Sequence, residues 1–227
     1  VGSEMCIRDS YKIIKGETTG DTEYFKKGFA SDEEREAYEA ELCATVEAEG
    51  AALLKNENNA LPLASGAKVS LFGHGSVDLM YGGTGSGSVD TSKAPNLKQA
   101  LEAQGITINQ TLWDLYKSDS MMSKYSRMTP ASISDTLEAN TQYAVNEAPW
   151  SALSSAESSF AEYGDAAIVV LSRSGGEGAD LPSGANGTND SWISGQEGDG
   201  NYLALSAEEI ELLQNLKALK DNGTFKN

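Results

Sequence analysis

The sequence predicts an α/β fold, a three-layer α/β sandwich with a mostly parallel sheet that is incomplete at the C-terminus. Two apolar runs, at 68–72 and 166–171, indicate strands, and the second is apolar without alternation, as expected for a strand covered on both faces. A segment with helical spacing of apolar residues follows each run. Strands that alternate with helices are typical of a parallel sheet with helices on its faces.

The sequence divides into three parts. Residues 1–10, VGSEMCIRDS, do not continue into any periodic pattern, and we interpret them as a non-native leader. Residues 11–30 are mixed and polar and are expected to form a linker or lead-in. Residues 31–227 are expected to form a partial α/β sandwich domain. Because the final helix should feed another strand, we expect the natural protein to continue.

Local signals place the individual elements. A Ser followed three residues later by Glu, the capping-box pattern, begins one helix at Ser31 and another at Ser206. Gly50 and Gly223 are placed to end these helices. Residues 110–160 are less periodic, so we expect a short helix near their start, irregular structure beyond it and no chemistry. The remaining expected elements are a strand at 68–72, a helix at 96–104 followed by Gly105, a strand at 106–108 and a strand at 166–171. The expected apolar faces are Tyr38, Leu42 and Val46 in the first helix and Ile210, Leu213 and Leu216 in the last.

Composition restricts the function. The 227 residues are 39% hydrophobic and carry 34 Asp and Glu against 17 Lys and Arg, a formal net charge of -17. Nucleic acid is therefore not an expected partner, because its binding needs a basic face. Cys6 lies in the leader and Cys43 on a predicted helix, so no disulfide or cysteine metal site is expected. His74 is the only histidine, which excludes a multi-histidine zinc site. No metal or cofactor is expected.

The most informative segment follows the strand at 166–171. Glycines surround a single carboxylate, Glu177, at the point where an α/β sheet places its ligand crevice. A carboxylate in such a loop is more often simply solvated, but a restrained and partly desolvated one can act as a general acid. Asp180 is the competing candidate, and we favour a supporting role for it. The long loop at 172–202 is typical of a functional segment.

A second glycine-rich segment follows the strand at 68–72, with six glycines from Gly73 to Gly87. Neither G-x-G-x-x-G nor G-x-x-x-x-G-K-[ST] is present, which argues against phosphate binding. A surface turn and a loop that approaches a sugar closely both remain open, the latter with Ser86 or Asp78 as hydrogen-bonding partner. His74 is expected to be structural. Trp192 could stack on a sugar ring, although tryptophans more often lie in cores or interfaces.

Four ordered motifs resemble the α/β sandwich domain of family 3 glycoside hydrolases, the β-glucosidase-like enzymes. They are EGAALLKNENNALPL with KVSLFG, then YGGTGSGSV, then AIVVLSRSGGEGADLP, then the capped helix that starts at LSAEE. The resemblance runs from about Glu49 to the end and is loose over 110–160. It implies a carbohydrate substrate and Glu177, in GGEGAD, as acid/base. From the two glycine-rich loops themselves, we expect substrate-binding or loop-shaping roles for Asp180, Gly83, Ser86, Gly176 and Trp192.

The resemblance also implies a missing partner. In this family a separate TIM-type barrel carries an Asp nucleophile, and retaining hydrolysis needs two carboxyl groups roughly 5 to 5.5 Å apart. The chain is therefore expected to be part of a retaining exo-acting β-glycosidase and to be inactive alone. One departure is Leu181, which stands where the family often has Arg, so a substrate or loop contact is expected to be absent.

The segment before Glu49 does not resemble the end of a barrel. This favours a permuted order, known among large family members, in which the sandwich domain precedes the barrel and can follow an N-terminal membrane anchor. The compartment is not determined by the sequence, but an extracytoplasmic location agrees with the acidic composition and scarce cysteine. The alternative is a non-catalytic carbohydrate-binding or interaction module with the same fold.

Overall fold

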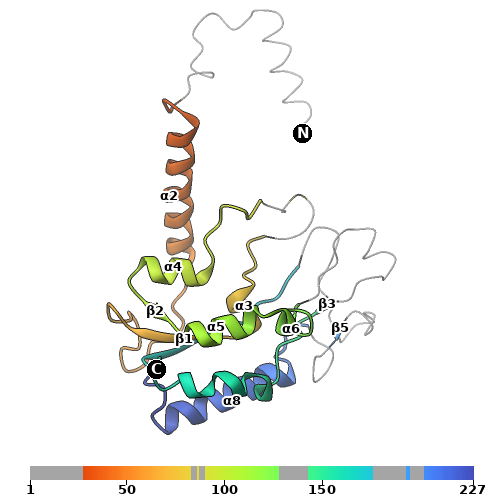
Figure 1. Cartoon of the computed structure of the whole chain (residues 1–227). Helices are drawn as coiled ribbons and strands as arrows, with labels where there is room; N and C mark the ends of the chain where they lie inside the picture. Colours follow the sequence, from red (N-terminus) through yellow and green to blue (C-terminus); the bar gives the residue numbers. More distant parts are fainter. Residues whose placement is uncertain (1–27, 83–85, 87–89, 128–142, 176–192, 195–201) are drawn as a thin grey trace, which may run out of the picture. The chain divides into compact units, whose positions relative to one another are not determined.

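The computed structural model describes residues 28–82, 86, 90–127, 143–175, 193–194 and 202–227 (Figure 1). The chain divides into two compact units, Val1–Glu57 and Asn58–Asn227, and each is described by itself.

The first unit contains one described helix, α2 (Asp32–Gly50). Its N-cap is Ser31, whose hydroxyl accepts a hydrogen bond from the backbone N–H of Glu34 at 3.2 Å, which confirms the predicted start. Gly50 is the last residue of the helix and Ala51 is its C-cap, one residue later than predicted. None of its residues is buried, so the expected apolar face covers no core in this unit.

The second unit is built on a parallel sheet. In chain order its elements are β1 (Lys68–Phe72), α3 (His74–Val77), α4 (Leu97–Ala103), β2 (Thr107–Ile108), α5 (Gln110–Lys117), α6 (Asp119–Met122), β3 (Tyr143–Ala144), the 3-10 helix η3 (Trp150–Ser159), β4 (Ala166–Val169), β5 (Ile193–Ser194) and α8 (Ala207–Asp221). Three strands pair in the order β2-β1-β4, and β3 pairs with β5. All these pairings are parallel, as predicted.

The apolar sequence of β1 forms the centre of the core. Val69, Leu71 and Phe72 are almost completely buried. Ser70 is buried between them, and its hydroxyl donates a hydrogen bond to the carbonyl of Tyr163, so burial leaves no unsatisfied donor there. The Phe72 ring lies within aromatic contact distance of the rings of Trp150, Phe160 and Phe225.

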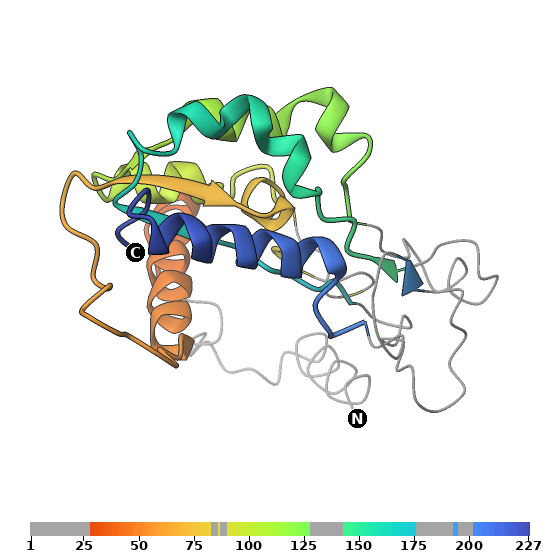
Figure 2. The ribbon, with the colours of Figure 1, turned by 90° about the horizontal axis from the view of Figure 1, so that it is seen from below.

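Helices cover both faces of the three-stranded sheet. Figure 1 shows α4 above the strands and η3 and α8 below them, and Figure 2 shows α8 running along the strands. Leu153 of η3 and Leu212 of α8 belong to the same buried cluster as β1. This arrangement is the three-layer α/β sandwich expected from the sequence.

The helix and strand that follow the glycine-rich segment agree with their predicted positions. α4 begins at Asn96, whose side chain accepts from the backbone N–H of Gln99 while the Gln99 side chain accepts from the backbone N–H of Asn96. Gly105 has a φ of 80° and lies between α4 and β2. This conformation favours glycine, which explains the sharp turn from helix to strand.

The described part of the region at 110–160 contains more regular structure than expected. The short helix predicted near its start is confirmed as α5, whereas η3 was not predicted. A 3-10 helix has three residues per turn, so its apolar spacing does not match the period of an α-helix. The expectation of no chemistry also needs correction, because Tyr116, Arg127 and Glu147 lie at the candidate site described below.

The strand predicted at 166–171 is shorter and less buried than expected. β4 ends at Val169, residues 168–170 are half-buried, and Leu171 is 38% exposed. The strand is therefore less buried than predicted over the described residues, and it lies at one edge of the three-stranded sheet. The backbone N–H of Ala167 donates to the carbonyl of Asn227, so the last residues of the chain run beside the start of β4.

The buried face of α8 differs from the predicted one. The capping box is confirmed, since Ser206 and Glu209 each accept from the backbone N–H of the other. Ile210 and Leu213 are only half-buried, whereas the buried positions are Glu209, Leu212 and Leu216. The Glu209 carboxylate can lie on the core-facing side of α8 because Arg173 pairs with it.

Candidate active site

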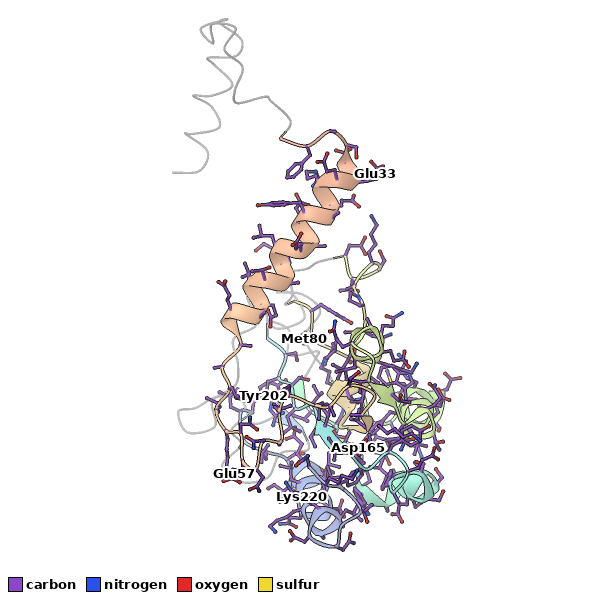
Figure 3. All side chains as sticks on the ribbon, turned by 90° about the vertical axis from the view of Figure 1, so that its left-hand side faces the viewer. Glu33, Glu57, Met80, Asp165, Tyr202 and Lys220 are labelled. Atoms are coloured by element: carbon purple, nitrogen blue, oxygen red, sulfur yellow. The ribbon has the colours of Figure 1, made fainter. Side chains whose placement is uncertain are left out.

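The carboxyl ends of β1 and β4 lie next to each other, and polar side chains collect beyond them. The two strands pair in register to their last residues. A Cβ atom added at Gly75 would lie 2.7 Å from the carbonyl oxygen of Val170, so only glycine fits this approach of the two chains. Figure 3 labels Met80, beyond this turn, and Asp165, at the amino end of β4. Ligands of open α/β sheets bind at the carboxyl edge.

Arg127 connects the chain after β1 to the chain after β4. Its guanidinium donates to the carbonyl oxygens of Asp78 and Leu79 at 2.6 and 3.3 Å and to the Ser172 hydroxyl at 3.3 Å. It also lies 3.0 Å from the Asp78 carboxylate, and His74 Nε2 lies 3.2 Å from the same oxygen. The hydrogen bond to His74, followed by the charge of Arg127, holds the pKa of Asp78 below its ordinary value.

Glu147 and Tyr116 satisfy backbone amides at the turn that follows β1. The Glu147 carboxylate, 4% exposed, accepts from the N–H of His74 at 2.7 Å and from the N–H of Ala148 at 3.0 Å. The Tyr116 hydroxyl accepts from the N–H of Gly73 at 3.1 Å. Burial raises the pKa of Glu147, and burial together with the nearby Glu147 charge raises the pKa of Tyr116. The turn is therefore fixed by buried side chains.

Arg173 connects the chain after β4 to the segment before α8. Its guanidinium donates to the carbonyl oxygens of Ser172, Tyr202 and Ala204 at 3.0, 2.7 and 2.6 Å. It also donates to both carboxylate oxygens of Glu209 at 2.7 and 2.6 Å. These five hydrogen bonds match the five N–H groups of a guanidinium, and the forked pair with Glu209 is the strongest geometry available to it.

Tyr202 adds a second connection at the same place. Its hydroxyl accepts from the backbone N–H of Ser174 at 3.1 Å and lies 3.1 Å from the Ser174 hydroxyl. Both residues are about 1% exposed. Ser174 and Tyr202 stand on either side of residues 175–201, so the two ends of this segment meet in a buried hydrogen-bonded contact.

The structure describes only one of the six site residues predicted from the sequence. Ser86 is exposed in the glycine-rich segment. The other five, Glu177, Asp180, Gly83, Gly176 and Trp192, lie outside the described residues. The structure brings together residues that flank the two predicted loops, and we call this group the frame. Its members are Asp78, Tyr116, Arg127, Glu147, Arg173, Tyr202 and Glu209.

Of the five charged residues of this frame, sequence reasoning named Asp78 as a possible site residue and missed the other four. Arg127 and Glu147 lie in the region of weak periodicity, where no local pattern marks them. Arg173 directly follows an apolar strand, and Glu209 occupies the third helical position of a capping box, so an arginine and a glutamate at these two places could have been proposed as a pair.

The part of the chain that the structure describes holds no three His, Cys, Asp or Glu side chains grouped as metal ligands. Over the same residues, no helix combines the length and the apolar character needed to cross a membrane.

The His74 ring contacts Asp78, and the nearby Ser76 hydroxyl donates to the carbonyl of Gly73. This agrees with the structural role expected for His74.

Comparison with known proteins identifies the family. The model of the "Glycosyl hydrolase family 3 C-terminal domain" matches residues 51–224. The chain belongs to this family of glycoside hydrolases, and the resemblance found in the sequence is confirmed.

Individual relatives agree. Beta-glucosidase A of Butyrivibrio fibrisolvens is 34% identical over 146 residues, which is 62% of this chain and 15% of that protein. The crystal structure of a beta-glucosidase from Paenibacillus barengoltzii matches with a TM-score of 0.57 and 26% identity over 79% of this chain and 17% of that one. Beta-glucosidase 3B from Thermotoga neapolitana, solved with α-D-glucose, matches in fold with a TM-score of 0.55 and 23% identity over 83% and 23%. The chain thus spans less than a quarter of the length of these relatives.

Proposed function

We propose that this chain supplies the acid/base carboxyl, Glu177, of a retaining exo-acting β-glycosidase that releases terminal glucose from β-glucosides. The observation that carries the proposal is the buried frame at the carboxyl ends of β1 and β4, where Arg173 and Tyr202 hold together the ends of the segment that contains Glu177. The family supports the proposal, and the names of the relatives supply the substrate class.

The chemistry follows from two carboxyl groups with different tasks. A carboxylate on a TIM-type barrel of the same protein attacks the anomeric carbon while Glu177 donates its proton to the departing glycosidic oxygen. Glu177, now ionised, then takes a proton from the water that releases the sugar from the barrel carboxylate. This chain supplies the second carboxyl only, so we expect the 227 residues alone to hydrolyse no glucoside.

The other predicted residues surround this reaction. We propose that Gly83 and Ser86 of the glycine-rich segment approach the sugar and that Trp192 stacks on it. We also propose that Gly176 lets the backbone turn before Glu177 and that Asp180 accepts hydrogen bonds that orient the loop.

The proposal is tested by replacing Glu177→Gln in the protein that unites this chain with its barrel. A general acid matters most when the leaving group is poor. We therefore expect kcat/KM for an alkyl β-glucoside to fall by roughly 10²–10⁴-fold, while kcat/KM for an activated dinitrophenyl β-glucoside changes little. An equal loss on both substrates would contradict the acid role.

Asp180→Asn is the matched control, because it changes a carboxylate three residues away in the same loop. If Asp180 only orients the loop, its loss should be smaller and should lack the strong dependence on the leaving group. A stronger leaving-group dependence for Asp180→Asn than for Glu177→Gln would reassign the acid.

A further inference from the structure

The contribution of Arg173 to the stability of the fold does not by itself account for its contacts. Its side chain is 14% exposed and that of Glu209 1% exposed, so the ion pair is largely removed from water. The cost of desolvating two charges cancels much of their attraction, and a buried pair therefore adds little net stability over apolar side chains. The position of the pair in the chain indicates a different role.

Among the described residues, the hydrogen-bond partners of Arg173 lie at the two ends of one segment. Ser172 belongs to the chain just after β4, whereas Tyr202, Ala204 and Glu209 belong to the chain that leads into α8. The guanidinium also lies over the Tyr202 ring, 5.9 Å from its centre. The forked geometry suits Arg and not Lys, which offers a single charge without a planar fork.

The same contact fixes α8. Glu209 accepts from Arg173 and, through the capping box, from the backbone N–H of Ser206 at 2.8 Å. The end of β4, the residues before α8 and the first turn of that helix therefore form one hydrogen-bonded unit. A rigid helix anchored in the core thus sets the position at which the segment 175–201 begins.

We propose that Arg173 is a positioning residue for the reaction, and that it acts through Glu177 by fixing the backbone from which the catalytic loop starts. The inference rests on the proposed role of Glu177. Glu177 follows Ser174 by three residues, and three residues span at most about 11 Å. A fixed Ser174 therefore limits how far from it the proposed acid can lie.

The test is Arg173→Lys in the protein that contains the barrel, measured with the same alkyl and dinitrophenyl β-glucosides. Lys keeps the charge but cannot make the forked contacts. Because a misplacement of about 1 Å can cost roughly a hundredfold in rate, we expect a loss of that order in kcat/KM on the alkyl glucoside. We expect little loss on the activated glucoside, and no further loss when Arg173→Lys is added to Glu177→Gln.

Ile108→Ala is the control for stability. Ile108 is 3% exposed and belongs to the core cluster, and it lies in β2, at the edge of the sheet opposite β4. This variant should unfold at a lower temperature without any leaving-group dependence. Tyr202→Phe is a milder second variant, which keeps the ring but removes the hydroxyl that accepts from Ser174. It should show a smaller loss of the same selective kind.

The results separate the two proposals. If Glu177→Gln shows the selective loss but Arg173→Lys and Tyr202→Phe lose activity equally on both substrates, or not at all, Arg173 is structural and the inference is overturned. If Glu177→Gln itself shows no selectivity, the proposed function fails first. A selective loss in Ile108→Ala would also overturn the inference, because general destabilisation would then explain the effect.

Discussion

Two carboxyl groups near the end of β1 have pKa values that are shifted in opposite directions. Asp78 contacts a guanidinium and an imidazole, which keep its pKa below the ordinary value. Glu147 is buried, and its hydrogen bonds to described residues come from the backbone N–H groups of His74 and Ala148, so burial dominates and its pKa rises. Neither residue carries a sequence motif, because these pKa values follow from contacts between distant parts of the chain.

The raised pKa of Glu147 predicts a particular dependence of stability on pH. The folded state binds the Glu147 proton more tightly than the unfolded state, whose pKa is near the ordinary 4.5. The free energy of unfolding therefore decreases as the pH rises from about 4.5 through the higher folded pKa. Glu147→Gln cannot ionise, so its stability relative to the natural chain should increase over this range in urea titrations at several pH values.

A control for this pH effect is Leu153→Ala, because it removes buried apolar atoms without changing an ionisable group. Its stability difference from the natural chain should be nearly flat over the same range. A flat difference for Glu147→Gln as well would mean that this carboxyl has no special proton affinity in the folded state.

The close approach of Gly75 to Val170 predicts a steric cost. In Gly75→Ala the new Cβ would lie 2.7 Å from the Val170 carbonyl oxygen and 3.0 Å from the Ser172 hydroxyl, so the chain must shift. We expect a loss of about 1–3 kcal/mol in the free energy of unfolding. Gly50→Ala introduces the same side chain where no atom lies within 4 Å, and should leave stability unchanged or slightly higher. Equal stability of the two variants would contradict the packing described here.

At the scale of elements, α8 depends on its capping box. Ser206 is fully buried, and it exchanges hydrogen bonds with Glu209, which also holds Arg173. Ser206→Ala should lower the free energy of unfolding by about 1 kcal/mol, measured by urea denaturation. Ser31→Ala removes the equivalent cap from α2 in the other unit, and should not change the unfolding of Asn58–Asn227. No loss in Ser206→Ala would show that the buried contacts alone fix this helix.

Elements with a local signal could be predicted from the sequence, whereas those set by distant contacts could not. The cap residues of α2 and α8 and the position of β1 were predicted, because each depends on neighbours in the chain. The burial of β4 was overestimated because its neighbours in the sheet are not visible in its own sequence. Arg127 was missed because its partners at Asp78 and Ser172 are brought to it only by the fold.

At the scale of the whole molecule, the structure describes the frame up to Gly175, two residues before the predicted catalytic residue Glu177. The motif GGEGAD and the family resemblance supply Glu177, and the structure supplies the buried contacts on either side of its segment. Neither provides a nucleophile. The proposed hydrolysis therefore requires a second domain that supplies the nucleophile. Without that domain, a chain of the same fold would be a carbohydrate-binding or interaction module.

The proposed hydrolysis by two carboxyl groups is tested most simply by sequencing the genomic reading frame on both sides of the chain. We predict that the frame also encodes a TIM-type barrel with an aspartate nucleophile, and the position of that barrel gives the domain order. Stop codons on both sides with no barrel between them would contradict the account, because two carboxyl groups could not then act on one glycosidic bond within this protein.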